Sequence, residues 1–247
     1  MQLKLFCAWL ILVVILAAGW YPFKKRLKDN NIHELVIGET LATGIFLGTA
    51  LMHMLPEATS QFQLMGYEYP YAYMLTGAVF LLFLWFEHLA TLLYKYRIGK
   101  SSAFALVAWA MLSIHSLISG TALGLTQQYS IIIILFIAII AHKWAESFGI
   151  AVQLNKSTLP TKVAILCFIA FALMTPIGIF IGWYFTINLE SNTLWNPIMT
   201  AASAGTFLYL GTLHGLEKCV MVERCCNLRD FSYVICGFIF MTIIAIL

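Results

Sequence analysis

The stretch SIIIILFIAIIAHKWAES, residues 130–147, ends an apolar run with three ionisable side chains: His142, Lys143 and Glu146. A helix needs about 20 residues to cross the roughly 30 Å of hydrocarbon in a bilayer. The apolar run that continues to residue 153 is long enough for this crossing. An ionisable side chain in hydrocarbon costs several kcal/mol unless it is paired or hydrated. The three side chains therefore indicate either a function or a mutual pairing inside a membrane-spanning helix.

The overall composition is typical of a membrane protein. Of the 247 residues, 62% are hydrophobic and 10% are charged, whereas a soluble domain has about 25% charged residues. The net charge of +3 is too small to indicate nucleic-acid binding, so no nucleic-acid partner is expected. The six cysteines show no CxxC spacing, which argues against a zinc ribbon and leaves the role of Cys225 and Cys226 open.

Eight apolar runs are each long enough to span the bilayer. They cover residues 3–23, 35–56, 70–94, 102–126, 130–153, 162–187, 195–218 and 229–247. The connections between them are short, so we expect an all-α polytopic membrane protein with a single transmembrane domain over residues 1–247. The first run resembles a signal peptide, but the basic cluster that follows it favours a retained helix.

The basic residues predict the orientation of these runs. Twelve of the fourteen Lys and Arg residues lie in the connections after the first, third, fifth and seventh runs. Connections on the cytoplasmic side of a membrane are enriched in Lys and Arg. The sequence therefore predicts that both chain termini lie outside the cytoplasm.

Two histidines are expected to meet near the middle of the membrane. His115 lies near the centre of the run 102–126, and His142 near the centre of the antiparallel run that follows. His142 and Glu146 are four residues apart and share a helix face, as do His115 and Ser119. Imidazole nitrogen and carboxylate oxygen are suitable ligands for Zn²⁺ and other first-row divalent ions. A structural alternative stays open, in which Glu146 pairs with Lys143 and stabilises the bundle.

Two other classes of protein use similar residues. A haem-binding membrane redox protein could use His115 and His142 as axial ligands, although haem ligation does not require Glu146 nearby. An intramembrane metalloprotease needs the motif His-Glu-x-x-His. The segment HELVIGE at residues 33–39 lacks the second histidine, so no enzyme is expected.

The chain resembles the Zrt/Irt-like (ZIP) family of divalent-metal transporters over nearly its whole length. The matching segments, in chain order, are GTALMHMLPEA, HSLISGTALG, HKWAES, TPIGIFIG and SAGTFLYLG. The resemblance implies eight transmembrane helices in a 3+2+3 arrangement, where three helices at each end form an inverted repeat around helices 4 and 5. It also implies termini outside the cytoplasm, a homodimer and an elevator-type alternating-access mechanism.

Matching of the motifs implies a single metal site on helices 4 and 5. The resemblance assigns His115, His142 and Glu146 as primary ligands. Ser119 lies where many members have an acid, and we expect it to be a weaker ligand than a carboxylate. Lys143 lies where some members have a second acid or an amide, so we expect its ammonium to substitute for a second cation.

Other polar residues mark an expected path on either side of this site. His53 and Glu57 could receive a cation at the outer end of the second run, or could form a hydrated helix end at Pro56. Each residue of the expected cytoplasmic exit could instead be an interfacial side chain. This exit is expected to involve Glu39, Glu87, His88, His214 and Glu217.

The expected function is zinc uptake into the cytoplasm across the plasma membrane, with no cofactor. Fe²⁺, Mn²⁺ and Cd²⁺ tolerate the same ligands, so the sequence does not select the metal. Imidazoles bind metal only when unprotonated, so we expect uptake to weaken as the external pH falls toward about 6. A flat profile of uptake rate against pH would contradict histidine ligation.

Overall fold

The computed structural model describes residues 2–25, 32–94, 99–188, 194–212 and 228–246. Every regular element within these ranges is a helix, which confirms the all-α class. The elements are α1 (Gln2–Lys25), α2 (Ile32–Gly48), the π-helical segment η1 (Thr49–Met54), α3 (Leu55–Leu64), α4 (Tyr71–Tyr94), α5 (Gly99–Leu125), α6 (Tyr129–Lys156), α7 (Thr161–Asn188), α8 (Trp195–Tyr209) and α9 (Leu228–Ile244).

Five of the described helices are long and apolar enough to cross a bilayer: α1, α4, α5, α6 and α7. The described parts of the other predicted runs are shorter or interrupted. The helix α9 has 17 residues, and η1 divides the second run. The chain is thus a helical membrane protein, and the total of eight spans stays a prediction.

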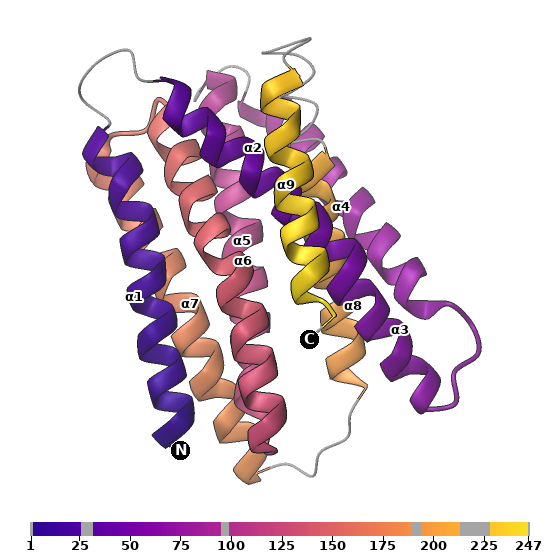
Figure 1. The fold of residues 1–247 in the computed structure, drawn as a ribbon. Coiled ribbons are helices and arrows are strands. Elements are labelled where there is room, and N and C mark those ends of the chain that lie inside the picture. Colours follow the sequence, from indigo (N-terminus) through magenta and orange to yellow (C-terminus); the bar gives the residue numbers. More distant parts are fainter. Residues whose placement is uncertain (1, 26–31, 95–98, 189–193, 213–227, 247) are drawn as a thin grey trace.

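The helices alternate in direction (Figure 1). The C-terminal ends of α1 and α6 lie at the same end of the bundle as the N-terminal ends of α2, α7 and α9. Lys24, Lys156 and Lys162 belong to these helix ends. These three basic residues therefore lie at the end that the sequence predicts to be cytoplasmic, whereas Lys4 lies near the other end of α1 and Lys143 lies in the interior.

The helices pack as two groups. Group I consists of α1, α5, α6 and α7, and group II consists of α2, η1, α3, α4, α8 and α9. The groups meet where α2 and α9 pack against α6, and where α4 and α8 pack against α5.

Glycines provide the closest helix contacts within each group. In group I, a Cβ added to Gly120 of α5 would collide with the carbonyl oxygen of Thr175 in α7. In group II, a Cβ added to Gly44 of α2 would collide with the carbonyl oxygen of Val234 in α9. Small residues that bring two helix backbones together are the common basis of tight packing in membranes. These contacts hold α5 against α7, and α2 against α9, at backbone distance.

The contact between the two groups is made by side chains. Gly149 of α6 faces the ring of Phe46 in α2, at ordinary van der Waals distance from its atoms. Near the predicted cytoplasmic end, Nζ of Lys156 in α6 lies 2.7 Å from Oε2 of Glu39 in α2. A closer contact joins the same two helices, where a Cβ added to Gly38 of α2 would collide with the ring of Phe148 in α6.

The second predicted run continues past its expected limit at residue 56. The π-helical turn Thr49–Met54 precedes Pro56, and α3 then extends to Leu64. Proline lacks an N–H donor and clashes with the preceding turn of an α-helix, and a wider π turn relieves this conflict. His53 and Glu57 therefore lie within a continuous helical segment and not at a helix end.

The first predicted run is an integral part of group I. Ile11 and Ile15 of α1 are fully buried. The hydroxyl of Ser147 in α6 donates to the carbonyl oxygen of Ile15 at 2.6 Å. Near the N-terminal end of α1, Nζ of Lys4 donates a hydrogen bond to the carbonyl oxygen of Gly124 in α5 at 2.5 Å. These bonds hold α1 against α5 and α6.

Candidate metal site

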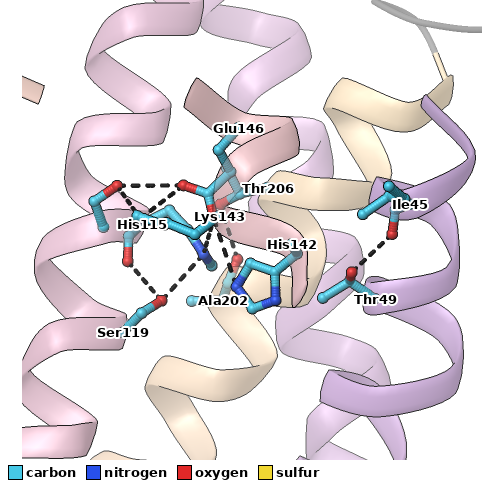
Figure 2. A network of polar contacts seen from close by, with 10 residues as sticks. Ile45, Thr49, His115, Ser119, His142, Lys143, Glu146, Ala202 and Thr206 are labelled. Atoms are coloured by element: carbon cyan, nitrogen blue, oxygen red, sulfur yellow. Dashed lines mark hydrogen bonds and ion pairs between the residues drawn. The ribbon is translucent and has the colours of Figure 1, made fainter. Parts of the chain in front are cut away.

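Three side chains that could hold a metal ion meet between α5 and α6 (Figure 2). His115 comes from α5, and His142 and Glu146 come from successive turns of α6. Each of the three is 1% exposed or less. One ligand atom from each residue lies within 4.8 Å of the other two. The fold therefore brings together the three residues to which the sequence assigns a common site.

The two carboxylate oxygens of Glu146 have different neighbours. Oε1 lies 3.4 Å from Nε2 of His115 and 3.5 Å from Nε2 of His142. Oε2 accepts hydrogen bonds from Nζ of Lys143 at 2.8 Å and from Oγ of Ser116 at 3.3 Å. One oxygen therefore faces the imidazoles, and the other faces an ammonium.

Several atoms of this cluster have no hydrogen-bond partner among the described residues. They are Oε1 of Glu146, both ring nitrogens of His142 and Nδ1 of His115. A buried polar atom without a partner costs about 1–3 kcal/mol, and such atoms are uncommon. A cation between Oε1 and the two Nε2 atoms would give a partner to Oε1 of Glu146 and to Nε2 of His142.

Lys143 lies beside the three ligand atoms and not among them. Its Nζ donates to Oγ of Ser116 at 2.7 Å as well as to Glu146. The ammonium also lies 5.4 Å from the ring centre of Phe171, at a distance that allows a cation–π interaction. The pairing of Lys143 with Glu146, which the sequence leaves as a structural alternative, therefore coexists with the contact between Glu146 and the imidazoles.

Ser119 lies one helical turn from His115 on the same face of α5. Its Oγ is 3.0 Å from Nε2 of His115 and 2.9 Å from the carbonyl oxygen of that residue. The hydroxyl has one hydrogen, which can turn to the carbonyl oxygen when Nε2 binds an ion. A lone pair of Oγ is then available beside the same ion.

Phe207 of α8 covers both imidazoles from group II. Its ring centre lies 4.2 Å from that of His115 and 5.3 Å from that of His142. The Phe207 ring also stacks on Phe46 at 5.2 Å and 13°. Phe207 carries no signal of its own in the sequence, because a phenylalanine is ordinary in an apolar run. Ser116 is recognisable there only as one of the small residues on α5, together with Gly120 and Gly124.

This packing argues against the haem alternative. The ring centres of His115 and His142 are 6.0 Å apart, and Phe207 packs against both. Axial ligation requires a wide planar macrocycle between the two imidazoles. The rings leave no room for one, and Glu146 occupies the space between them.

The residues expected at the outer entrance line a cavity between the two groups, which we call the outer cavity. It has a volume of about 380 Å³, with His53 and Glu57 on one wall and Ile134 and Ala138 of α6 on the other. Nε2 of His53 lies 3.8 Å from Oε2 of Glu57. Nε2 of Gln61 donates to Oε1 of Glu57 at 3.1 Å. A carboxylate and an imidazole therefore face this cavity together.

The residues expected at the cytoplasmic exit have different surroundings. Glu39 is buried and accepts two hydrogen bonds from Nζ of Lys156, at 2.7 and 2.9 Å. Glu87 accepts a hydrogen bond from the hydroxyl of Tyr209, and His88 is exposed on α4. Glu39 is thus the member of this set that reaches the contact between the groups. Four residues named from the sequence lie outside the described residues: His214, Glu217, Cys225 and Cys226.

A helical membrane bundle with two histidines and a carboxylate converging in its interior is the architecture of a polytopic metal-handling protein. Residues 95–245 match the model of the family described as ZIP zinc transporter. The chain belongs to this family, which confirms the resemblance found in the sequence. Members of the family are transporters and not enzymes.

Individual relatives extend the similarity to nearly the whole chain. Zinc transporter ZIP2 of Mus musculus is 28% identical, over 98% of this chain and 97% of that protein. Zinc transporter ZIP2 of Homo sapiens is 26% identical, over 99% of this chain and 97% of that protein. Zinc transporter 1 of Oryza sativa subsp. japonica is 26% identical, over 87% of this chain and 73% of that protein.

Proposed function

We propose that this protein transports divalent transition-metal ions across a membrane, and that it takes zinc up into the cytoplasm. The observation that carries the proposal is the convergence of Nε2 of His115, Nε2 of His142 and Oε1 of Glu146 on one buried space. The names of the relatives, which are zinc transporters, support zinc as the substrate.

The ligand set suits an ion that must leave again. Zinc commonly takes three or four nitrogen and oxygen ligands, and Ser119 is placed to be a fourth, weaker one. A metal-binding histidine usually donates a hydrogen bond from its other ring N–H to a carboxylate or carbonyl oxygen, which strengthens the site. Within the described part of the chain, Nδ1 of His115 and Nδ1 of His142 have no such acceptor. This lack of support favours a transport site over a permanent structural one.

Lys143 takes the place of a second metal ion in this proposal. Its ammonium occupies the side of the Glu146 carboxylate that faces away from the imidazoles. A second divalent cation near Oε2 would meet this fixed positive charge at close range in a medium of low dielectric constant. The site therefore holds one ion.

One face of α6 provides the route from the outside to this site. Ala138 lines the outer cavity, and His142 and Glu146 follow at successive turns. Residues four apart lie on one face of a helix. An ion received by His53 and Glu57 in the outer cavity would thus reach the imidazole of His142 by passing along one turn of α6.

The same face of α6 continues toward the cytoplasm. Gly149 and Gln153 line a small inner cavity of about 30 Å³, together with Glu39 and Phe46. This space is enough for a water molecule. Here the route is closed by the stacked rings of Phe46 and Phe207 and by the pair of Glu39 with Lys156, and these contacts must separate when the ion leaves.

Alternating access then follows from movement between the two groups. Group I carries all three ligands, whereas Phe46, Phe207 and Glu39 belong to group II. Sliding of group I against group II, an elevator-type movement, would carry the ion from the outer cavity to the inner one.

The family resemblance and the Lys and Arg residues in the connections support the remaining parts of the proposal. They are eight transmembrane helices in a 3+2+3 inverted-repeat bundle, a single domain over residues 1–247, both termini outside the cytoplasm, a homodimer, and residence in the plasma membrane. His214 and Glu217 extend the proposed cytoplasmic exit beyond Glu39 and His88.

Uptake of radiolabelled zinc by cells or vesicles that contain the protein tests this function. Changing His142 to Ala removes a primary ligand, so we expect the initial uptake rate to fall by at least about 100-fold. Changing Ile133 to Ala is the matched control, because this side chain lies on the exposed surface of the same helix. Equal uptake by the His142→Ala variant and the parent would reject the site, and competition by Fe²⁺, Mn²⁺ and Cd²⁺ would define its selectivity.

A further inference from the structure

An ion pair joins the two groups on the proposed cytoplasmic side of the route. Nζ of Lys156, the last residue of α6, lies 2.7 Å from Oε2 and 2.9 Å from Oε1 of Glu39 in α2. One ammonium therefore engages both oxygens of the carboxylate. Carboxylate oxygens are also ligands for Zn²⁺. While the pair is intact, Lys156 occupies the oxygens that an outgoing metal ion would use.

The two partners of this pair differ in their access to water. The side chain of Glu39 is 6% exposed, whereas that of Lys156 is 44% exposed. A lysine at an interface can place its ammonium in water while its carbon chain stays against the protein. A buried carboxylate needs a cation beside it, because an unpaired charge in the interior is costly. Glu39 is thus the fixed partner, and Lys156 is the exchangeable one.

The carboxylate of Glu39 is accessible from the proposed route as well. Glu39 lines the inner cavity together with Gln153 of α6. Gln153 follows Glu146 by seven residues, which is two turns and about 10 Å along the helix axis. An ion that leaves Glu146 therefore approaches Glu39 from the interior of the bundle, whereas Lys156 approaches it from the cytoplasmic end.

We propose, on the basis of the transport function proposed above, that Lys156 is a displaceable counter-ion of Glu39. The outgoing metal ion binds Glu39 in place of the ammonium, and the ammonium moves into the cytoplasmic solution. When the ion has left, Lys156 returns to Glu39. Because the two cations compete for the same oxygens, Lys156 lowers the affinity of the cytoplasmic face for zinc and promotes release.

Zinc flux through membrane vesicles of the two orientations tests this competition. Inside-out vesicles present zinc to the cytoplasmic face of the full chain, and right-side-out vesicles present it to the outer face. Changing Lys156 to Gln removes the competing charge, so we expect the half-saturating zinc concentration at the cytoplasmic face to fall about fivefold. This factor corresponds to a coupling of about 1 kcal/mol between the paired charges. The change at the outer face should be smaller, and Lys156→Arg, which keeps the charge, should behave as the parent does.

Two further variants control this experiment. Changing Lys162 to Gln removes the same charge from an exposed side chain at the same end of the bundle, and should leave the half-saturating concentration unchanged. Changing Glu39 to Gln removes the carboxylate, so Lys156→Gln should have no additional effect in that background. The proposal is overturned by an unchanged value in Lys156→Gln, by an equal shift in Lys162→Gln, or by the same shift without the Glu39 carboxylate. Absence of zinc flux in the parent would instead reject the transport function.

A second measurement needs no change at residue 156. The rate at which an amine reagent modifies Lys156 in the purified protein is followed by mass spectrometry, with Lys162 as the internal reference. A reagent has less access to an ammonium held at a buried carboxylate than to one in water. Saturating zinc should therefore raise the rate at Lys156 and not at Lys162, and in the Glu39→Gln variant Lys156 should react fast with or without zinc. A parent that transports zinc but shows no such rise would keep its function and disprove the displacement of Lys156.

Discussion

Replacing Glu146 by glutamine is expected to abolish metal uptake, although the side chain keeps almost the same volume. The amide cannot supply the negative charge that both the bound ion and Lys143 require. We expect the initial rate of radiolabelled zinc uptake, normalised to the amount of protein in the membrane, to fall by at least about 100-fold. The single variant also leaves a buried ammonium unpaired, which typically costs about 3–5 kcal/mol of stability.

A double variant separates loss of binding from loss of stability. Changing Lys143 and Glu146 together to glutamine removes both charges, and two amides can still bond to each other and to Ser116. We expect the thermal unfolding temperature in detergent to return toward that of the parent, while uptake stays at background. Recovery of uptake in the double variant would show that Glu146 serves stability alone and is not a ligand.

Replacing Gly120 by valine is expected to prevent formation of a stable group I. The new Cβ would collide with the carbonyl oxygen of Thr175 and lie close to the backbone nitrogen of Ile179. Backbone atoms cannot rotate out of the way, so α5 and α7 must separate. We expect a loss of more than about 3 kcal/mol, at the upper end of the cost of overpacking, seen as a large fall in thermal unfolding temperature.

The same substitution at Gly77 provides the control. Gly77 lies within α4, and a Cβ added there meets no atom within 4 Å. Changing Gly77 to valine therefore alters only the intrinsic helix preference, which is worth less than about 1 kcal/mol. An equal fall in unfolding temperature for both variants would mean that the contact with α7 is not what Gly120 provides.

The long helices were predictable because a bilayer of fixed thickness requires about 20 apolar residues per crossing, and such a run can be read directly from the sequence. The helix α6 covers residues 129–156, close to the predicted run 130–153. The second run was harder, because a proline normally interrupts a helix. The π turn that lets the helix continue past Pro56 to Leu64 leaves no signature in the pattern of apolar residues.

The candidate site was predictable where sequence spacing determines geometry. His142 and Glu146 are four residues apart, which places them on one face of α6. His115 lies near the centre of the preceding run, so it was expected at the same depth in the membrane as His142. The orientation of the Glu146 oxygens and the packing of Phe207 against the imidazoles depend on tertiary contacts between helices, and spacing within one helix carries no information about them.

The stacked rings of Phe46 and Phe207 also bear on what does not cross the membrane. Protons pass along unbroken chains of hydrogen-bonded water. The outer cavity of about 380 Å³ can hold several waters, and the inner one has space for about one. The two rings offer only apolar surface between the imidazoles and the inner cavity, so a water chain is broken there. On the proposed route, water could therefore enter from the side of the larger cavity without forming a path for protons across the membrane.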